Sequence, residues 1–340
     1  MDCKKAINNA REIIGESRDN DYVISPQSHQ TIYKDKSTEL SEILGSSKLE
    51  SIARRYEEND EIAMKAQQEF TKVFNRANRL VLMTAIVISA ILAIGILAQE
   101  TEQSHVNYIL GGLGAVSILS GAVATKDLHT MKNGHLLENW MEKRANAETA
   151  RLEYFENLVN ETPQSQESGN TYGDLLKLEY FRRYQLSVQL VYYRERSKDH
   201  KEQSSRLLSF SSWAAAGTAI AAGTATFSFQ GEIFTAVAAF GVIFSALSTY
   251  ASLREGTYQY RRNSERYYRT ADTLEKLYAQ LDDVRQAVCK AGSKPLLEYI
   301  EVVHEQLSLE HRQWQKQLDA SKGSYGRLQH TLDDVLSKAG

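Results

Sequence analysis

Arginine and tyrosine are concentrated in two stretches of the chain, and both residue types can bind phosphorylated ligands. Eleven of the eighteen tyrosines lie within residues 172–193 and 250–278, where arginine is also frequent. A guanidinium group binds phosphate through its planar fork, and a tyrosine ring can stack on a nucleic-acid base. The two stretches therefore predict a nucleotide or oligonucleotide site, provided that helices present these side chains together.

Basic residues recur at helical spacing in both stretches. Arg262, Arg266 and Arg269 occupy positions i, i+4 and i+7 and share one helix face. The same pattern occurs at Arg194, Lys198 and Lys201. Neighbouring cations on a helix repel one another, so an anionic ligand would stabilise them. The candidate ligand-binding residues are Arg182, Arg183, Arg194, Lys198, Lys201, Arg261, Arg262, Arg266, Tyr267, Tyr268 and Arg269, with the four from Arg266 to Arg269 preferred.

A second interpretation of these residues stays open. Basic residues at the cytosolic face of a membrane bind anionic lipid headgroups, and tyrosines there form an interfacial belt. Acidic residues in or beside the same stretches can also pair with the arginines along each helix. They include Glu195, Asp199, Glu202, Glu255 and Glu265.

Four apolar blocks predict the elements that position these stretches. They run Leu80–Ala98, Val106–Thr125, Leu207–Gly231 and Ile233–Leu253. Roughly 20 helical residues span a hydrocarbon core of about 30 Å, so each block is long enough. A buried helix of a large soluble protein is the alternative for any one block, but four uncharged, closely paired blocks favour the membrane. We expect an all-α integral membrane protein whose four transmembrane helices form two hairpins that continue into long cytosolic helices.

Charges beside the apolar blocks predict the orientation. Lys and Arg flank the outer ends of both hairpins, whereas the connecting turns carry Glu100, Glu102 and Glu232 and neither Lys nor Arg. By the positive-inside rule, the turns face outward and both termini are cytoplasmic, in a multi-pass membrane protein of the inner-membrane type. If the helix after the last block is straight, Arg266 to Arg269 lie roughly 18 to 24 Å from the membrane edge. The blocks contain no Asp, Glu, Lys or Arg, which disfavours a proton-coupled transporter.

Small residues four positions apart form two rows in the third block. Ala214, Thr218, Ala222 and Thr226 make one row, and Ala215, Ala219 and Gly223 make the next. Small residues allow helices to approach closely in lipid, either within one hairpin or between subunits. Four thin helices make a poor pore, so a conducting function requires a homo-oligomer, for which we take a tetramer. The candidate pore or packing residues are Ala215, Thr218, Ala219, Ala222, Gly223 and Thr226.

An internal repeat with an offset of 124 residues is indicated by pattern more than by identity. The offset aligns residues 147–149 with 271–273 and superposes the apolar blocks. Each copy reads as helix, span, turn, span and helix. The predicted organisation is an N-terminal cytosolic segment (1–47), a first unit (48–159), a linker (160–173), a second unit (174–290) and C-terminal cytosolic helices (291–340), including one over Pro295–Ala320.

The residue patterns that would indicate catalysis or metal binding are incomplete in this sequence. Cys3 and Cys289 lie far apart without ligand spacing and predict free thiols in a reducing compartment. His304-Glu305 begins like a zinc-protease helix, but Ser308 occupies the second histidine position. The net charge of −3 points to no class of partner. We expect neither an enzyme, nor a cofactor, nor a metal site.

The second unit resembles a known family. A Tyr/Arg-rich helix, YYRERSKDHKEQSSRLL, leads into a two-span hairpin, and EGTYQYRRNSERYYRTADTLEKL follows it. A later helix, LLEYIEVVHEQLSLEHRQWQKQL, contains Glu310 and Trp314. Over about residues 175–320 the chain is similar to the SLATT family of two-span bacterial membrane proteins. Residues 48–158 look like a divergent second copy, which departs from the usual single unit.

The resemblance implies an effector of a bacterial anti-phage system, with partners that are nucleotidyltransferase-like or sense nucleotides. We expect an oligomeric ion channel that a nucleotide or short oligonucleotide opens or holds shut, and that depolarises the membrane. Anionic lipids are further expected partners. The alternative is a non-conducting membrane scaffold that recruits a cytosolic partner through residues 1–50 and 295–340.

Overall fold

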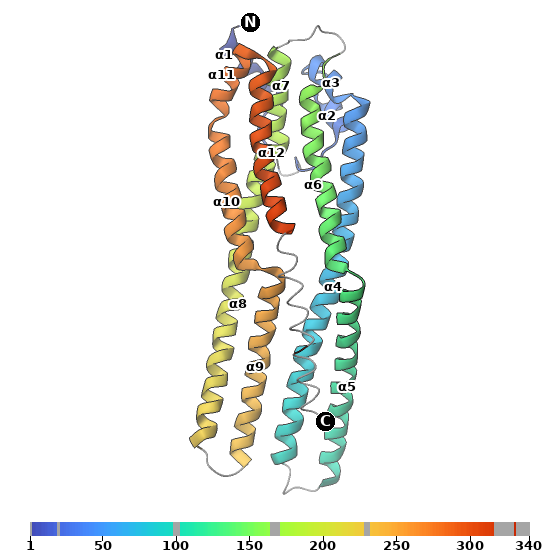
Figure 1. The fold of residues 1–340 in the computed structure, drawn as a ribbon, viewed down its shortest axis with the longest axis vertical. Coiled ribbons are helices and arrows are strands. Elements are labelled where there is room, and N and C mark those ends of the chain that lie inside the picture. Colours follow the sequence, from blue (N-terminus) through green and yellow to red (C-terminus); the bar gives the residue numbers. More distant parts are fainter. Residues whose placement is uncertain are drawn as a thin grey trace. The chain divides into compact units, whose positions relative to one another are not determined.

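The computed structural model describes residues 2–18, 21–97, 103–163, 171–227, 232–315 and residue 330, and the regular structure in these residues is helical throughout (Figure 1). This confirms the predicted all-α class. With only three prolines in the chain, little interrupts the long helices. The elements are α1 (Cys3–Ile14), α2 (Pro26–Tyr33), α3 (Thr38–Leu44), α4 (Ser47–Leu97), α5 (Gln103–Asn133), α6 (Leu136–Asn160), α7 (Thr171–Phe181), the π-helix η1 (Arg182–Ser187), α8 (Val188–Phe227), α9 (Glu232–Tyr258), α10 (Tyr260–Ala279), α11 (Leu281–Ala291) and α12 (Ser293–Gln315).

The chain forms two compact units that cut across the predicted linear domains. Unit 1 contains residues 1–66, 140–199 and 264–316. Unit 2 contains residues 67–139, 200–263 and 317–340. Each unit therefore combines segments from distant parts of the chain. The apolar hairpins belong to unit 2, and the polar helices that lead into and out of them belong mainly to unit 1.

Unit 1 is built around α7 and η1. Every residue from Gly173 to Ser187 is buried, because α1, α3, α11 and α12 all pack against α7. The centre is aromatic: Tyr154, Phe155, Tyr180 and Phe181 are all fully buried. The predicted linker 160–173 is shorter than expected, since Asn160 ends α6 and α7 already begins at Thr171. The predicted helix over Pro295–Ala320 is α12, of which residues 316–320 lie outside the described part.

The N-terminal segment is an integral part of the unit 1 core. Tyr33, Leu40 and Leu44 are fully buried in the same cluster as Leu176 and Leu178 of α7. Cys3 of α1 and Cys289 of α11 form a disulfide, with their Cα atoms 5.9 Å apart. The prediction of two free thiols is therefore wrong. Packing of α1 against α11 brings the two residues together, and a sequence separation of 286 residues gives no sign of it.

The first hairpin consists of α4 from Gln67 onward and α5, both within unit 2. Thr84 and Ser120 form a buried hydrogen bond between the helices, with their oxygens 2.7 Å apart. Below this contact α5 exposes large apolar side chains, including Ile118 (69%) and Leu119 (66%). Over residues 47–95 and 105–133, these helices are long and apolar enough to cross a membrane.

The second hairpin consists of α8 from His200 onward and α9. Its helices meet through small residues: a Cβ at Gly217 would lie 2.7 Å from the Phe244 ring, and one at Gly241 would lie 3.3 Å from Ala221. Ser211 and Ser248 are also within hydrogen-bonding distance, at 3.3 Å.

The number of candidate spans is two in the described residues, where the sequence predicted four. Helices do occupy the third and fourth blocks, but neither meets the criterion of length and hydropathy over its described residues. The apolar half of α8 is rich in Ala, Gly, Ser and Thr, which lowers its hydropathy. The end of the third block, residues 228–231, also lies outside the described residues.

Both hairpins are followed by a break where a straight helix was expected. His135 separates α5 from α6 with φ of 46°, and Gln259 separates α9 from α10 with φ of 48°. A left-handed conformation at a residue with a side chain costs roughly 1–2 kcal/mol and interrupts the helical hydrogen bonds. The distance of 18 to 24 Å expected for Arg266 to Arg269 along a straight helix therefore does not apply.

The two breaks lie 124 residues apart, which is the offset of the predicted repeat. The starts of α4 and of α7, at Ser47 and Thr171, differ by the same number. So do the starts of α6 and α10, at Leu136 and Tyr260. The similarity of the two halves is thus stronger in helix boundaries than in residue identity.

Candidate functional site

In unit 1, the first part of α8 packs closely against α10. Ser197 and Ser264 each donate a hydroxyl hydrogen bond to the other's backbone carbonyl, at 3.0 and 2.9 Å. One turn of α8 earlier, the rings of Tyr193 and Tyr267 lie 5.6 Å apart. Small polar residues and aromatic rings therefore form the seam between the two Tyr/Arg-rich stretches, as a shared site would require.

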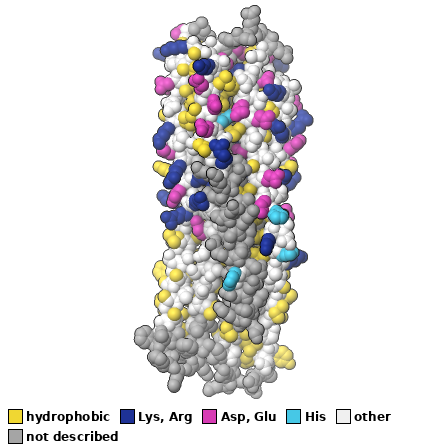
Figure 2. Space-filling view, in the orientation of Figure 1, with side chains coloured by type: hydrophobic (Ala, Val, Ile, Leu, Met, Phe, Trp, Pro, Cys, Tyr) yellow, Lys and Arg dark blue, Asp and Glu magenta, His cyan; other side chains and the backbone are white. Residues whose placement is uncertain are grey.

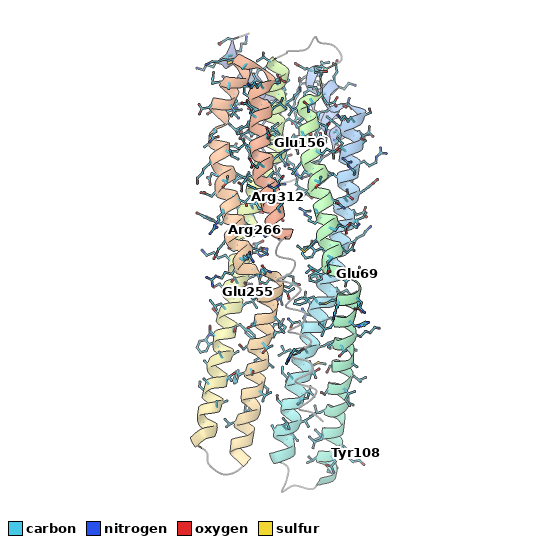
Figure 3. The ribbon with its side chains drawn as sticks, in the orientation of Figure 1. Glu69, Tyr108, Glu156, Glu255, Arg266 and Arg312 are labelled. Atoms are coloured by element: carbon cyan, nitrogen blue, oxygen red, sulfur yellow. A yellow bond between two sulfur atoms is a disulfide. The ribbon has the colours of Figure 1, made fainter. Side chains whose placement is uncertain are left out.

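The preferred residues on α10 divide into a buried and an exposed pair. Arg266 is only 7% exposed, and its guanidinium carbon lies 5.1 Å from the centre of the Tyr267 ring (Figure 3). Tyr268 is 65% exposed, and Arg269 is exposed beside it. Arg266 and Tyr267 thus belong to the packed side of α10, and Tyr268 and Arg269 are available to a ligand from solution.

On α8 the basic residues differ in how they are paired. Arg194 forms an ion pair with Glu275 of α10. Lys198 is exposed, and neither it nor Arg269 forms an ion pair with any described residue. Arg196 is 3.9 Å from Asp199 and stacks over Tyr192 at 5.5 Å. The ion pairs of Arg194 and Arg196 are of the kind that the second interpretation expected, and the ligand site stays a prediction. We call the surface defined by Lys198, Tyr268 and Arg269 the α8/α10 face.

Arg182 and Arg183 occupy a different environment from the other predicted ligand residues. Arg182 is 2% exposed; its Nε donates to Glu179 at 2.6 Å, and its Nη2 donates to the carbonyl of Gly15. Arg183 donates to both oxygens of Asp21, at 2.7 and 3.0 Å. Because these guanidinium groups face internal carboxylates, they connect η1 to the N-terminal segment. The glutamate three residues before Arg182 is the one signal in the sequence that points to such pairing.

Sequence reasoning missed a buried polar network that surrounds η1. Arg151 of α6 donates through Nε to Gln185 at 2.7 Å and through Nη2 to the carbonyl of Tyr184 at 3.0 Å. Arg285 of α11 donates to Glu179 at 2.6 Å. Such networks are costly to disrupt, since each partner would leave a buried polar group unsatisfied. They fix the position of η1, from which α8 continues.

Two buried histidines belong to the same core. His29 Nδ1 lies 2.6 Å from the hydroxyl of Tyr180, and burial lowers the pKa of His29 to about 4, with Asp21 opposing and Arg183 adding to the shift. His304 of α12 lies 3.2 Å from Glu156 of α6, and burial lowers its pKa although Glu156 acts in the opposite direction. In the described residues, no group of three His, Cys, Asp or Glu side chains is placed to hold a metal ion.

The remaining predicted ligand residues, Lys201, Arg261 and Arg262, lie in unit 2 near the break at Gln259. All three are exposed, and the backbone amide of Arg261 donates to Glu255 at 2.9 Å. The rings of Tyr258 and Tyr260 stack at 5.2 Å across the break, and Phe74 of α4 contacts Tyr258 at 5.3 Å. We call this contact of α4 with the α9–α10 break the Tyr258 joint.

The predicted small-residue rows of α8 are only partly used within the hairpin. Ala214 and Ala221 are 3% and 6% exposed, and with Gly217 they face α9. Ala215 and Ala219 are exposed. Thr218, Ala222 and Gly223 lie on the same helix, and the side chain of Thr226 lies outside the described part. The residues that face α9, Ala214, Gly217 and Ala221, therefore follow the spacing i, i+3 and i+7. The row through Ala215 and Ala219 lies on a different face of α8.

A groove of about 810 Å³ in unit 1 lies in the N-terminal segment and not at the α8/α10 face. Its lining includes Glu12, Glu39 and Lys36 together with Asn9 and Tyr172. With two carboxylates for one ammonium group, the groove is poorly suited to phosphate. The volume of this groove is therefore no reason to place a phosphorylated ligand in it.

Comparison with known proteins identifies one domain. Residues 181–314 match the family model SLATT_1, described as SMODS and SLOG-associating 2TM effector domain 1. The chain thus carries a SLATT effector domain that runs from η1 to α12, in agreement with the resemblance seen in the sequence. Residues 48–158, the predicted divergent copy, show no such match. No curated protein and no solved structure matches the chain.

Proposed function

We propose that this chain is the membrane effector of an anti-phage defence system, and that it assembles into an oligomeric pore whose opening depends on a nucleotide or short oligonucleotide. The observation that carries the proposal is the SLATT effector domain over residues 181–314, in a chain with two further helices long and apolar enough to span a membrane.

Both hairpins are proposed to lie in the membrane. The matched domain is described as a two-span domain, and within its boundaries the apolar helices are α8 and α9. The two helices that meet the span criterion, α4 and α5, lie outside it. Like α5, α8 and α9 expose large apolar side chains: Leu208 (70%), Trp213 (78%), Ile220 (69%) and Phe240 (59%). In Figure 2, the coloured part of the face over the apolar halves of α8 and α9 shows no Lys, Arg, Asp or Glu side chains. Lipid is the solvent that suits such a surface.

We propose oligomerisation because the four apolar helices of one chain are too few to enclose a pore. Ala215 and Ala219 lie exposed on α8, away from the residues that contact α9. In lipid, a face of small residues favours close approach of another helix. We therefore assign this face to contacts between subunits around a pore, with a tetramer as the working stoichiometry.

The α8/α10 face is the proposed ligand site. Lys198 of α8 and Arg269 of α10, which pair with no described residue, are exposed on packed helices together with the ring of Tyr268. This arrangement combines phosphate binding with base stacking. A ligand changes a pore equilibrium only if it binds one state more tightly than the other. The breaks at His135 and Gln259 are the places where a movement of the cytosolic helices can alter the hairpins.

The test is electrical recording of the full chain in planar bilayers, with adenine and guanine oligonucleotides as probes. We expect a conductance that the active oligonucleotide changes in either direction. The variant Lys198→Ala/Arg269→Ala should lose the response and keep the conductance. Its matched control, Lys290→Ala/Lys294→Ala, removes the same charge from exposed positions of α11 and α12 and should respond normally. A silent bilayer under all conditions would contradict the pore and favour the scaffold.

A further inference from the structure

The first hairpin carries a cationic groove that the proposed function does not use. The groove lies on the α4 side of unit 2, has a volume of about 500 Å³, and is lined by Lys72, Asn75, Arg76, Arg79 and Leu80. Its three cations occupy positions i, i+4 and i+7 of α4 and thus share one helix face. Leu80 is the first residue of the first apolar block, so the groove lies where this hairpin changes from polar to apolar.

The charges in the groove are not balanced. Arg76 donates through Nε and Nη2 to both oxygens of Asp127 of α5, at 2.6 and 2.5 Å, and Asp127 is 2% exposed. Lys72 and Arg79 are exposed and form no ion pair with any described residue. Two positive charges therefore remain after Asp127 has neutralised Arg76, and an anion would balance them.

The donors at the centre of the groove are held in place. The bidentate pair with Asp127 fixes the guanidinium plane of Arg76, whose side chain is still 52% exposed. The carboxamide oxygen of Asn75 accepts a hydrogen bond from Tyr258 at 3.4 Å. The NH2 group of Asn75 therefore points away from Tyr258. A planar guanidinium held at one edge presents its remaining N–H groups in a fixed direction, as phosphate recognition requires.

The apolar surroundings distinguish a lipid from a soluble nucleotide. Among the described residues, no aromatic ring on which a base could stack lines the groove, whereas Leu80 does line it. One turn further along α4, Met83 is 41% exposed on the same face as Arg76 and Arg79. From Lys72 to Arg79 the helix rises by about 10 Å, enough to cross a headgroup layer of roughly 5–8 Å beside the hydrocarbon core.

We propose that this groove binds the phosphate of an anionic phospholipid, with Lys72, Arg76, Arg79 and the Asn75 amide around the headgroup and Leu80 and Met83 along the acyl chains. The site is independent of the α8/α10 face. Because Asn75 also contacts Tyr258, the bound lipid lies one hydrogen bond from the Tyr258 joint.

Native mass spectrometry of the full chain in detergent tests the proposal, with phosphatidylglycerol and phosphatidylcholine as probes. We expect phosphatidylglycerol to bind about tenfold more tightly or better, from the contributions of two basic residues. Lys72→Gln/Arg79→Gln should lose this preference. Lys126→Gln/Lys132→Gln, which removes the same charge from exposed positions of α5, should retain it. Lys72→Arg/Arg79→Lys should also retain it, because both positive charges remain in the groove.

Three outcomes would overturn the proposal. Equal affinity of the wild-type chain for both lipids would exclude an anionic lipid site. An equal loss in the two glutamine variants would assign the preference to general surface charge and not to the groove. If soluble ATP displaced phosphatidylglycerol at an ATP concentration lower than that of the lipid, the groove would be a site for free nucleotides.

Discussion

The two hairpins begin and break at corresponding positions but are held together by different chemistry. In the first, a buried hydroxyl pair and the bidentate bond of Arg76 to Asp127 join α4 to α5. In the second, Gly217 of α8 lies against the Phe244 ring of α9, and Ala221 lies against Gly241. The second hairpin also has a hydroxyl pair, Ser211 and Ser248, but over a longer distance of 3.3 Å. Because the first hairpin has the shorter polar contacts, we expect it to be the fixed element and the second hairpin the mobile one.

The polar helices before the two hairpins differ as well. The first part of α4, residues 47–66, has many exposed side chains along the surface of unit 1. The corresponding helix of the second half, α7 with η1, is buried on all sides. The second half is thus connected directly to the unit 1 core, and the first half only along one side. A signal received in unit 1 would therefore act most directly on the second hairpin.

The largest expected effect comes from breaking the clamp of the first hairpin. Arg76→Met leaves the carboxylate of Asp127, which is 2% exposed, without its partner, and should lower the free energy of unfolding more than any of the variants that follow. The double variant Arg76→Met/Asp127→Leu should recover most of this loss. Thermal unfolding in detergent, followed by tryptophan fluorescence, measures both.

The matched control is Arg206→Met in the second hairpin, whose exposed pair with Glu202 should contribute less than about 1 kcal/mol. If Arg206→Met were as destabilising as Arg76→Met, the contrast between a fixed and a mobile hairpin would be wrong.

A pH effect should come next in size and tests the connection of the second half to the core. His29 faces Tyr180 and Tyr184 of that helix, near Asp21 and Arg183. Its pKa falls from 6.5 in the unfolded chain to about 4 when folded, so the unfolded state binds the proton first. The contribution of neutral His29 to the free energy of unfolding is fully present above pH 6.5 and should decline by about 3 kcal/mol as the pH falls toward 4.

His29→Gln should flatten this decline, with His304 supplying a residual slope of the same sign. His129→Gln, on exposed α5, should leave the decline unchanged. An unaltered slope in His29→Gln would show that His29 is not responsible. The measurement is the unfolding midpoint at half-unit steps between pH 7 and 4.

Periodicity in the sequence was sufficient for the helices, because helix formation depends on local spacing, whereas the repeat itself stays a prediction. Side-chain partners depend on which helices meet. Arg182 and Arg183 look like ligand residues in the sequence, and only the packing of the N-terminal segment reveals Asp21 and Gly15 beside them. The Cys3–Cys289 disulfide and the pair of Arg76 with Asp127 have the same origin. The breaks at His135 and Gln259 escaped notice because neither residue is glycine or proline.

A smaller effect is expected from filling the contact of the second hairpin. Gly217→Ala places a methyl group against the Phe244 ring and should destabilise the chain by about 1–3 kcal/mol. Gly111→Ala in the first hairpin is the matched control, since nothing lies within 4 Å of its Cβ position. There, alanine should be neutral or slightly stabilising through helix propensity. Equal effects at the two glycines, in the same unfolding measurement, would remove the distinction in packing.

The smallest expected effect on the free energy of unfolding comes from substitutions at the two breaks, His135 and Gln259, and it tests whether the breaks are equivalent. Glycine adopts positive φ without the cost of a side chain, so His135→Gly and Gln259→Gly should each stabilise the chain by about 1 kcal/mol, net of glycine's own entropy. His135→Ala and Gln259→Ala keep the penalty and should not stabilise it. Unequal gains at the two positions would show that the breaks carry different strain despite their common spacing.

The same glycine variants separate the two hairpins in function. A flexible Gln259→Gly break would transmit less movement from the cytosolic helices, so the response of the bilayer current to oligonucleotide should decrease. His135→Gly should leave that response nearly unchanged, since the first hairpin is held by Asp127 and not by its connection to α6. A loss at His135 with none at Gln259 would reverse the assignment of the fixed and the mobile hairpin.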